Sequence, residues 1–350
     1  MSASRPPRQL GQLWLSRARE FTREPGVLFW VFGFPLLLAV ALGIAFRDRG
    51  AERSVVLVAD TGDAQASGAL VEALAASPLL EPRAAPAPEA EERFGRGEGL
   101  VLVRLGHPPE TAFDPARPGA AVAAAAVRDA LERAAGRRDV LDVREATAVA
   151  PGRRYVDFLI PGLLGLSLLS GGIWGVGYGV VGMRVKRLLK RLAATPMSRP
   201  AFLASFLLHR LSVAFLEAAF LLVFARLAFG VVLRGSWLDL LALIVAGAAS
   251  FSGLGLLIAS RARNMETANG LMNLASLPMW LLSGVFFSTS NFPGWLRPFV
   301  DALPLTALND ALRGVVNDGH GLLALLPQVG ILLAWGIVCF ALALRLFRWQ

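Results

Sequence analysis

Runs of about 20 apolar residues recur along this chain, and they constrain its fold more than any other feature. A helix of that length matches the thickness of the hydrocarbon core of a bilayer. A water-soluble domain has no need for such runs, and 55% of the 350 residues are hydrophobic. The sequence therefore predicts an α-helical membrane protein.

Six of these runs predict six transmembrane helices. They cover residues 27–46, 157–182, 201–230, 238–259, 266–287 and 322–344, so that residues 157–350 form a five-helix transmembrane domain. Positive charge near the ends of spans is retained on the cytoplasmic side. The predicted cytoplasmic ends carry 15 basic residues, whereas the short outer loops carry only Arg234, Arg297 and Arg313. We therefore expect both termini to be cytoplasmic.

Residues 1–26 precede the first span and predict a helix in the inner headgroup layer. Its apolar side chains share one helical face: Leu10, Leu13, Trp14, Ala18 and Phe21. Arginines lie beside this face, and a Pro-Gly pair at residues 25 and 26 then breaks the helix. The pattern is typical of an interfacial amphipathic helix. A solvated N-terminal tail is the alternative.

Residues 47–156 differ from the rest of the chain in composition. Residues 47–154 contain 15 basic and 17 acidic side chains, many prolines and the periodicity of a soluble domain. A stretch of this length is large enough to bury its own core, so we expect a small extracytoplasmic α/β domain. The predicted elements are strands at residues 54–60, 99–105 and 140–149 and helices at residues 64–76 and 120–135. The proline-rich residues 81–88 predict a loop or the remnant of a short strand at residues 79–80.

A basic segment joins the second and third predicted spans. Residues 183–199 carry six basic side chains and no carboxylate. The apolar residues Val185, Leu188, Leu189 and Leu192 recur at helical spacing, so the segment predicts an amphipathic coupling helix within residues 184–199. A Thr-Pro pair then ends this helix. Tethered to spans at both ends, the helix can push on a partner outside the membrane, or its charges bind anionic lipid only.

Polar and small residues inside the spans mark further candidates. Glu217 lies near the middle of the third span, with Arg210 seven residues earlier on the same face. An intramembrane ionisable residue is a candidate functional site, and the alternative is a structural hydrogen bond to a neighbouring helix. In the second span, Gly171, Gly175 and Gly179 repeat every four residues and predict the close approach of a helix, from this chain or from a second copy.

Residues 288–318 are half apolar and interrupted by three prolines. Leu305, Leu308 and Leu312 fall on one helical face within them. The segment is too short for two crossings, so it predicts outer re-entrant helices that dip into the membrane and return.

Several classes of site are not expected. Lys186 and Lys190 are the only lysines, and neither stands in the G-x-x-x-x-G-K context of a phosphate-binding loop. The three histidines lie far apart, and Cys339 is the only cysteine, so we expect neither a metal site nor an intrachain disulfide. We therefore do not expect this chain to be an ATPase or to hold a cofactor of its own.

Three segments together resemble the type-2 permease family of ABC exporters, the membrane subunits that work with separate ATPase subunits. They are YVDFLIPGLL at residues 155–164, KRLAATPMSR at residues 190–199, and LPMWLLSGVFF at residues 277–287, the last followed by Trp295, Leu-Pro-Leu at residues 303–305, and Arg313. Their order and spacing carry the resemblance. A large domain after the first span occurs in one branch of the family.

The resemblance implies that this chain is a transport subunit, not an enzyme, in a bacterial plasma (inner) membrane. It implies a permease dimer, of identical or related copies, bound to two ATPases that hold ATP and Mg. It implies export of an amphiphilic or hydrophobic substrate such as a lipid, a lipid-linked glycan or a drug. The implied ATPase-coupling residues are Arg187, Lys190, Arg191, Leu192, Thr195 and Pro196. The implied outer gate consists of Phe286, Phe287, Pro304 and Arg313. Membrane lipids are further partners; a periplasmic adaptor, the substrate or the second copy are candidate partners of the outer domain, and nucleic acid is not expected.

One departure from the family pattern concerns the cytoplasmic segment. The family commonly has acidic residues and a Gly-Thr pair there, whereas residues 184–188 read RVKRL. Either the ATPase surface is more acidic than usual, or residues 192–198 make the main contact. Two other classes stay open: an ATP-independent secondary transporter, for which internal repeats are expected, and a membrane sensor or assembly protein with a ligand-binding outer domain.

Overall fold

The computed structural model describes residues 6–46, 53–106, 108–138, 154–188 and 199–346. The chain divides into two compact units. Met1–Arg47 and Val149–Gln350 form a helical unit, and Asp48–Ala148 form an α/β unit. Each unit has hydrophobic core residues of its own.

The helical unit contains α-helices interrupted by short π-helical and 3-10 segments. Its first part consists of α1 (Pro6–Arg23), α2 (Pro25–Leu28), the π-helix η1 (Phe29–Gly33), α3 (Phe34–Ala45), α7 (Tyr155–Ser170), the π-helix η2 (Gly171–Tyr178) and α8 (Gly179–Val185). Its second part consists of α10 (Arg199–Phe229), α11 (Trp237–Arg261), α12 (Met265–Leu282), the 3-10 helix η3 (Thr289–Asn291), α13 (Arg297–Asp301), α14 (Pro304–Arg313), the π-helix η4 (Gly314–Asp318), the 3-10 helix η5 (Leu322–Leu325) and α15 (Leu326–Leu346).

Five helical stretches among the described residues are long and apolar enough to cross a membrane. They are Pro25–Ala45, Tyr155–Val185, Ser205–Phe229, Trp237–Arg261 and Leu322–Leu346. They match five of the six predicted spans. The predicted fifth span forms helix α12, which is not one of these five.

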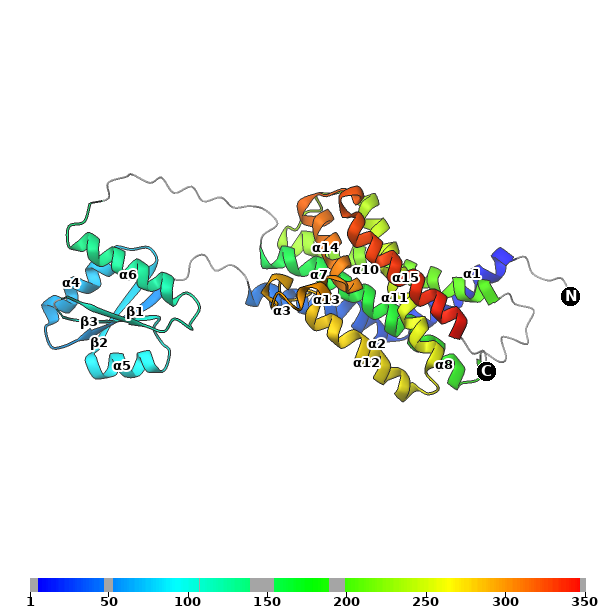
Figure 1. Cartoon of the computed structure of the whole chain (residues 1–350), viewed down its shortest axis with the longest axis horizontal. Coiled ribbons are helices and arrows are strands. Elements are labelled where there is room, and N and C mark those ends of the chain that lie inside the picture. Colours follow the sequence, from blue (N-terminus) through cyan, green and yellow to red (C-terminus); the bar gives the residue numbers. More distant parts are fainter. Residues whose placement is uncertain (1–5, 47–52, 107, 139–153, 189–198, 347–350) are drawn as a thin grey trace. The chain divides into compact units, whose positions relative to one another are not determined.

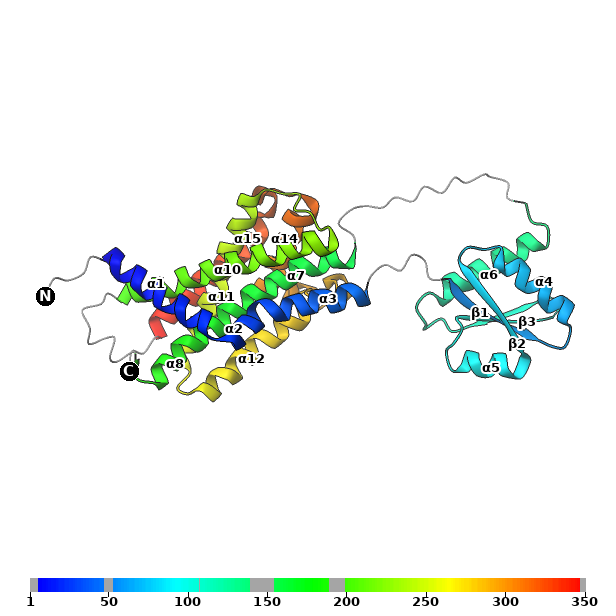
Figure 2. The ribbon, with the colours of Figure 1, turned by 180° about the vertical axis from the view of Figure 1, so that it is seen from behind.

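Helix α11 is the central element of the helical unit. It packs against α15, η2, α10, α7 and α14, and its Phe251 is among the largest fully buried side chains. Figure 2 shows α1, α2 and α3 along the near side of the bundle. Helices α3 and α15 keep broad apolar faces exposed, with Ile44 64% and Ile337 68% exposed. Exposed apolar faces of this extent suit contact with lipid or with another membrane helix.

The α/β unit is a small sheet covered by helices on both faces. Its elements are β1 (Ser54–Asp60), α4 (Ala64–Ala75), β2 (Leu80–Pro86), α5 (Ala87–Gly95), β3 (Val101–Arg104), β4 (Glu110–Phe113) and α6 (Ala120–Ala134). The strand order is β2-β1-β3-β4, with β1 parallel to both neighbours and β4 antiparallel to β3. Because side chains alternate along a strand, Val56 and Val58 face α4 and α6, while Leu57 and Ala59 face α5 (Figure 1).

The predicted elements of this unit are mostly confirmed. Strands β1 and β3 and helices α4 and α6 lie where the pattern placed them, whereas the predicted third strand at residues 140–149 lies outside the described residues. For residues 81–88 the strand alternative is confirmed and the loop is wrong, since Leu80–Pro86 form β2 and α5 begins at Ala87. Among the described strands β2 pairs with β1 only, and an edge strand tolerates Pro82 because one side of its backbone needs no donors. The short strand β4 was not predicted.

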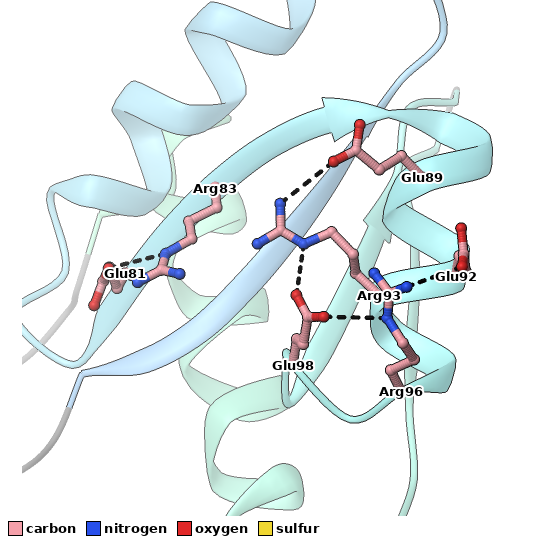
Figure 3. Close-up of polar contacts among 7 residues, drawn as sticks. All are labelled: Glu81, Arg83, Glu89, Glu92, Arg93, Arg96 and Glu98. Atoms are coloured by element: carbon pink, nitrogen blue, oxygen red, sulfur yellow. Dashed lines mark hydrogen bonds and ion pairs between the residues drawn. The ribbon is translucent and has the colours of Figure 1, made fainter.

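Ion pairs cover the α5 side of this unit (Figure 3). Arg93 donates a hydrogen bond of 2.7 Å to Glu98, and Arg96 pairs with Glu92 at 2.9 Å and with Glu98 at 3.2 Å. These side chains are largely solvent-accessible, and exposed pairs stabilise a fold weakly. We interpret the cluster as a solvated charged face.

We expect Glu98→Gln to reduce the protection of residues 96–100 from hydrogen exchange at pH 7. The Arg93 guanidinium lowers the pKa of Glu98, mainly by donating a hydrogen bond to its carboxylate. A lowered folded-state pKa stabilises the fold above the unfolded-state pKa, and this contribution is lost as the pH falls through the folded-state value. At neutral pH the protection factors of the Glu98→Gln chain should therefore be lower than those of the unmodified chain, by less than about fivefold. In acid the two sets of values should converge. Glu72→Gln, on the opposite face of the sheet, is the control, and an equal effect of both variants at pH 7 contradicts the prediction.

Candidate functional site

Arg187 is the only predicted ATPase-coupling residue in the part of the chain that the structure describes. Lys190, Arg191, Leu192, Thr195 and Pro196 lie outside the described residues. Arg187 has φ 55°, a left-handed conformation in which an α-helix does not continue. The prediction of one helical face starting at Val185 is therefore wrong, because Val185 is the last residue of α8 and the chain turns before Leu188. Lys186 and Arg187 form an exposed basic turn directly after the second span.

Arg184 ties this basic turn to the central helix. Its Nη1 donates hydrogen bonds to the carbonyl oxygens of Ala259, at 2.5 Å, and Ala262, at 2.8 Å. These carbonyls lie at the C-terminal end of α11, where helical acceptors lack intrahelical donors and the helix dipole favours a cation. The end of the second span is thereby joined to α11.

Helix α1 packs against the first half of α10. Trp14 Nε1 donates to Ser212 Oγ at 3.2 Å, and Arg17 Nε donates to Ser205 Oγ at 3.3 Å. The Arg17 guanidinium carbon also lies 3.2 Å from the centroid of the Phe206 ring, a cation–π contact. The face predicted to be apolar is thus the face that contacts α10, with Arg17 added to it.

Burial lowers the pKa of Arg17 to about 10, and the nearby Glu20 opposes this shift. Arg17 therefore remains charged at neutral pH. Phe21 completes the contact by packing edge-on against His209 of α10, with ring centroids 5.8 Å apart. These contacts fix α1 on the helix that follows the basic segment.

Arg210 and Glu217 form a buried bidentate ion pair within α10. Arg210 Nη1 donates to Glu217 Oε1 at 3.0 Å and Nη2 donates to Oε2 at 3.2 Å, and the side chains are 5% and 4% exposed. Nη2 also donates to the carbonyl oxygen of Ser167, at 3.0 Å, and lies 3.5 Å from that of Leu168. The hydrogen bond to a neighbouring helix, considered above for Glu217, is therefore made by Arg210.

Gly171 provides the space for the Arg210 guanidinium. A Cβ atom at Gly171 would lie 2.0 Å from Arg210 Cζ. The predicted face of Gly171, Gly175 and Gly179 is not the one that lies against the backbone of another helix, since Gly171 and Gly179 meet side chains of α10. Gly172 and Gly177 are the pair that allows the backbone of α11 to approach, whereas a Cβ atom at Gly175 meets nothing within 4 Å.

Arg313 joins three elements at the other end of the bundle. Its Nε and Nη2 atoms donate to the carbonyl oxygen of Phe158 in α7, both at 3.3 Å, and Nη2 also donates to the carbonyl oxygen of Gly284 after α12. The guanidinium carbon lies 3.7 Å from the centroid of the Phe158 ring. The helix that carries Arg313, α14, is buried over most of its length, including Leu305, Leu308 and Leu312.

A proline explains a second link in the same region. Pro161 has no N–H, so the carbonyl oxygen of Asp157 lacks its helical donor. Asn317 Nδ2 of η4 donates to that oxygen at 2.8 Å. Arg154 forms two hydrogen bonds to the Asp157 carboxylate, of 3.0 and 2.9 Å, and donates to the carbonyl oxygen of Phe229 at 2.9 Å.

Sequence reasoning missed Asn317, Asp157 and Arg154. Pro161 was the available signal, because a proline inside a span leaves the carbonyl oxygen four residues earlier without its helical donor. A buried carbonyl of this kind requires a donor from another part of the chain.

The other three predicted gate residues, Phe286, Phe287 and Pro304, differ in how exposed they are to solvent. Phe286 is half-buried, and its carbonyl oxygen accepts a hydrogen bond of 3.4 Å from Tyr155 Oη. Phe287 is 64% exposed, whereas Pro304 is buried in the first turn of α14, where its missing N–H costs nothing. Of the four predicted gate residues, Arg313 is the one whose side chain hydrogen-bonds to other elements, α7 and the turn after α12.

Comparison with known proteins identifies the chain. The model of the ABC-2 type transporter family matches residues 131–317, just over half of the sequence. The chain belongs to the ABC-2 type transporter family. Five of its described helices are long and apolar enough to cross a membrane, as in a multi-pass permease.

Two curated relatives of this ABC-2 permease match about half of it. ABC transporter G family member 20 of Dictyostelium discoideum is 26% identical over 172 residues, which cover 49% of this chain and 24% of that protein. The linearmycin resistance permease protein LnrN of Bacillus subtilis (strain 168) is 25% identical over 161 residues, which cover 45% of this chain and 41% of that protein. The chain thus spans less than half the length of either relative.

The family match of this ABC-2 permease includes the basic turn, the Arg210–Glu217 pair and the Arg313 contacts. Helix α1 and most of the α/β unit precede it. Across the described ranges, His, Cys, Asp and Glu form no group of three or more that could hold a metal ion.

Proposed function

We propose that this ABC-2 permease is the membrane subunit of an ATP-powered exporter in a bacterial plasma membrane. A separate ATPase subunit binds and hydrolyses ATP with Mg, and two permease copies work with two ATPases. The family supports an ATPase partner in general. The observation that carries the proposal for this chain is the exposed turn Lys186-Arg187, which directly continues a buried span.

The proposed topology has six spans and two cytoplasmic termini. Helix α12 is the additional span, residues 288–318 form re-entrant helices on the outer side, and the α/β unit is extracytoplasmic. The distribution of basic residues supports this arrangement. The burial of α14 against α7, α11 and α15 supports a segment that enters the bundle rather than one that lies on its surface.

Force applied by the ATPases at the basic turn reaches the core of the bundle. In the span Tyr155–Val185, 78% of the most apolar 18-residue window is buried inside the protein. In Pro25–Ala45 the corresponding share is 11%. Arg184 links the same end to α11. Movement of the turn therefore moves the elements that pack around α11, and the transport cycle alternates between two arrangements of them.

The proposed substrate is amphiphilic or hydrophobic: a lipid, a lipid-linked glycan or a drug. The apolar faces of α3, α12 and α15 support entry of such a molecule from the bilayer, since Ile44, Leu281 and Ile337 are 64%, 72% and 68% exposed. One relative is named for linearmycin resistance, which supports the inclusion of drugs.

We expect charge reversal at Arg187, Lys190 and Arg191 to uncouple ATPase activity from transport. Three glutamates repel the ATPase surface that receives the basic segment but leave the apolar spans unchanged. Substrate-stimulated ATPase activity and transport in proteoliposomes should fall at least about tenfold, with normal membrane insertion, because like charges placed at a contact cost several kcal/mol.

The matched control reverses Arg261 and Arg263, two exposed arginines at the end of α11. If the basic segment only binds anionic lipid, both variants should lose activity equally. Unchanged stimulated activity in the triple variant contradicts the coupling role. Purification of the unmodified chain provides the simpler test, since an ABC ATPase should co-purify with a permease subunit and not with a secondary transporter or a sensor.

A further inference from the structure

The segment between α12 and α14 presents large aromatic side chains on its exposed side. Trp295 is 73% exposed and Phe299 is 70% exposed. Val300, the neighbour of Phe299 within α13, is fully buried. Helix α13 and the turn before it therefore have one side on the protein and another side that the described chain leaves uncovered. Contiguous exposed apolar surface of this kind marks an interaction site.

The fold holds these two aromatic side chains in place. Arg297 Nη2 donates to the carbonyl oxygen of Ser290 at 2.8 Å, and its Nε donates to that of Phe292 at 3.3 Å, so that η3 folds against α13. At the other end of α13, Trp335 Nε1 of α15 donates to the carbonyl oxygen of Ala302 at 3.0 Å. The exposure of the aromatic pair is thus set by a segment that is tied to the bundle.

Other elements also expose aromatic side chains at this end of the bundle. Phe46, directly after α3, and Trp237, the first residue of α11, are both exposed. The ring of Phe46 stacks on that of Tyr155, with centroids 4.4 Å apart, at the start of α7. The start of α11 lies beside η4, because the N–H of Gly235 donates to the carbonyl oxygen of Val315 at 2.9 Å. Since η4 is also bound to the start of α7, these aromatics share one end of the helical unit.

The distribution of these aromatic residues favours a bilayer as their partner. They belong to several elements, whereas a second copy of the chain would cover one side of the bundle. A bilayer surrounds the protein, and aromatic side chains gather at the level of its head groups. Trp and Phe are also typical of the membrane-facing side of interfacial helices.

The charged residues of α13 fix its depth. Arg297 and Asp301 are exposed, and moving them into the hydrocarbon core would be costly. Exposure of Trp295 and Phe299 to water would be unfavourable as well. The boundary between head groups and acyl chains accommodates both kinds of side chain.

We infer that residues 292–301 form an interfacial anchor that inserts Trp295 and Phe299 among the lipid head groups, and that α14 is the part of residues 288–318 that enters the bundle. That the anchor lies in the outer leaflet rests on the proposed topology, whereas the insertion itself does not. Because α13 packs against α14, the anchor fixes the height of α14 and of Arg313 relative to the membrane surface.

Nitroxide labels test the anchor in the purified chain in lipid nanodiscs, without an ATPase. The labelled variants are Phe299→Cys and Trp295→Cys, each in a Cys339→Ala background that removes the native cysteine. Val122→Cys is the matched aqueous control, because Val122 on α6 of the α/β unit is 69% exposed. Ile337→Cys on α15 is the control within a span. Collisions with lipid-soluble oxygen and with a water-soluble nickel chelate give the depth of each label.

We expect the labels at Phe299→Cys and Trp295→Cys to lie about 5–10 Å into the boundary between head groups and acyl chains, shallower than Ile337→Cys. Nickel access equal to that of Val122→Cys overturns the anchor. Shielding from both reagents also overturns it, because protein would then cover the patch, and so does a depth equal to that of Ile337→Cys, because α13 would then lie in the hydrocarbon core. A chain that shows the expected depth but recruits no ATPase contradicts the proposed function alone.

Discussion

Replacing Arg210 alone by leucine is expected to destabilise the helical unit by about 3–5 kcal/mol. The substitution leaves the Glu217 carboxylate 4% exposed and removes its two hydrogen-bond donors. It also removes the donor to Ser167 in α7. A buried charge without a partner is among the few changes with effects of this size.

The double replacement of Arg210 and Glu217 by leucine is expected to cost far less, because an apolar pair of similar volume leaves no charge to neutralise. With Glu217→Leu as the second single variant, the comparison is a double-mutant cycle on thermal unfolding of the purified chain, where 1 kcal/mol corresponds to about 2–4 °C. Equal melting temperatures of the single and double variants contradict this account. Leu216→Ala, on the exposed side of the same helix, is the control for loss of a large side chain.

The membrane spans were predictable because long apolar runs report their own environment. Hydrophobicity over 20 or so residues is a local property, so five runs, including residues 238–259, correspond to observed helices long enough to span. The strand β1 was predictable for a related reason, since its buried residues are contiguous in sequence. Strand β2 was predicted only as one of two alternatives, because its prolines are tolerated through its edge position among the described strands, and that position depends on the other strands.

Contacts between distant residues depend on information that the sequence pattern does not hold. The spacing of Arg210 and Glu217 placed them on one face of a helix. That Gly171 leaves space for the Arg210 guanidinium depends on which helix packs against α10 and on which of its residues lies beside Arg210. Gly172 and Gly177, which meet the backbone of α11, are five residues apart, so the four-residue glycine pattern did not select them. Asn317 and Asp157 are 160 residues apart and meet only because Pro161 leaves a carbonyl without a donor.

Replacing Arg313 by methionine is expected to destabilise the helical unit by about 3 kcal/mol, because buried hydrogen bonds from a charged donor are worth more than neutral ones. The variant keeps most of the side-chain length but removes the donors to the carbonyl oxygens of Phe158 and Gly284. Those carbonyls belong to α7 and to the turn after α12, so the loss separates α14 from both. If residues 288–318 form the outer re-entrant segment, the Arg313→Met variant should also transport less substrate than the unmodified chain.

Arg297→Met is the matched control for Arg313→Met. Arg297 also donates to backbone carbonyls, those of Phe292 and Ser290, but it is exposed and its partners lie within seven residues. Its replacement is expected to change stability by less than about 0.5 kcal/mol. Arg313→Lys should fall between wild type and Arg313→Met, since an ammonium group is a point charge and does not reproduce the planar fork of the guanidinium. Melting temperatures in one detergent decide the order, and equal shifts for Arg313→Met and Arg297→Met would show that the link from α14 to α7 does not stabilise this end of the bundle.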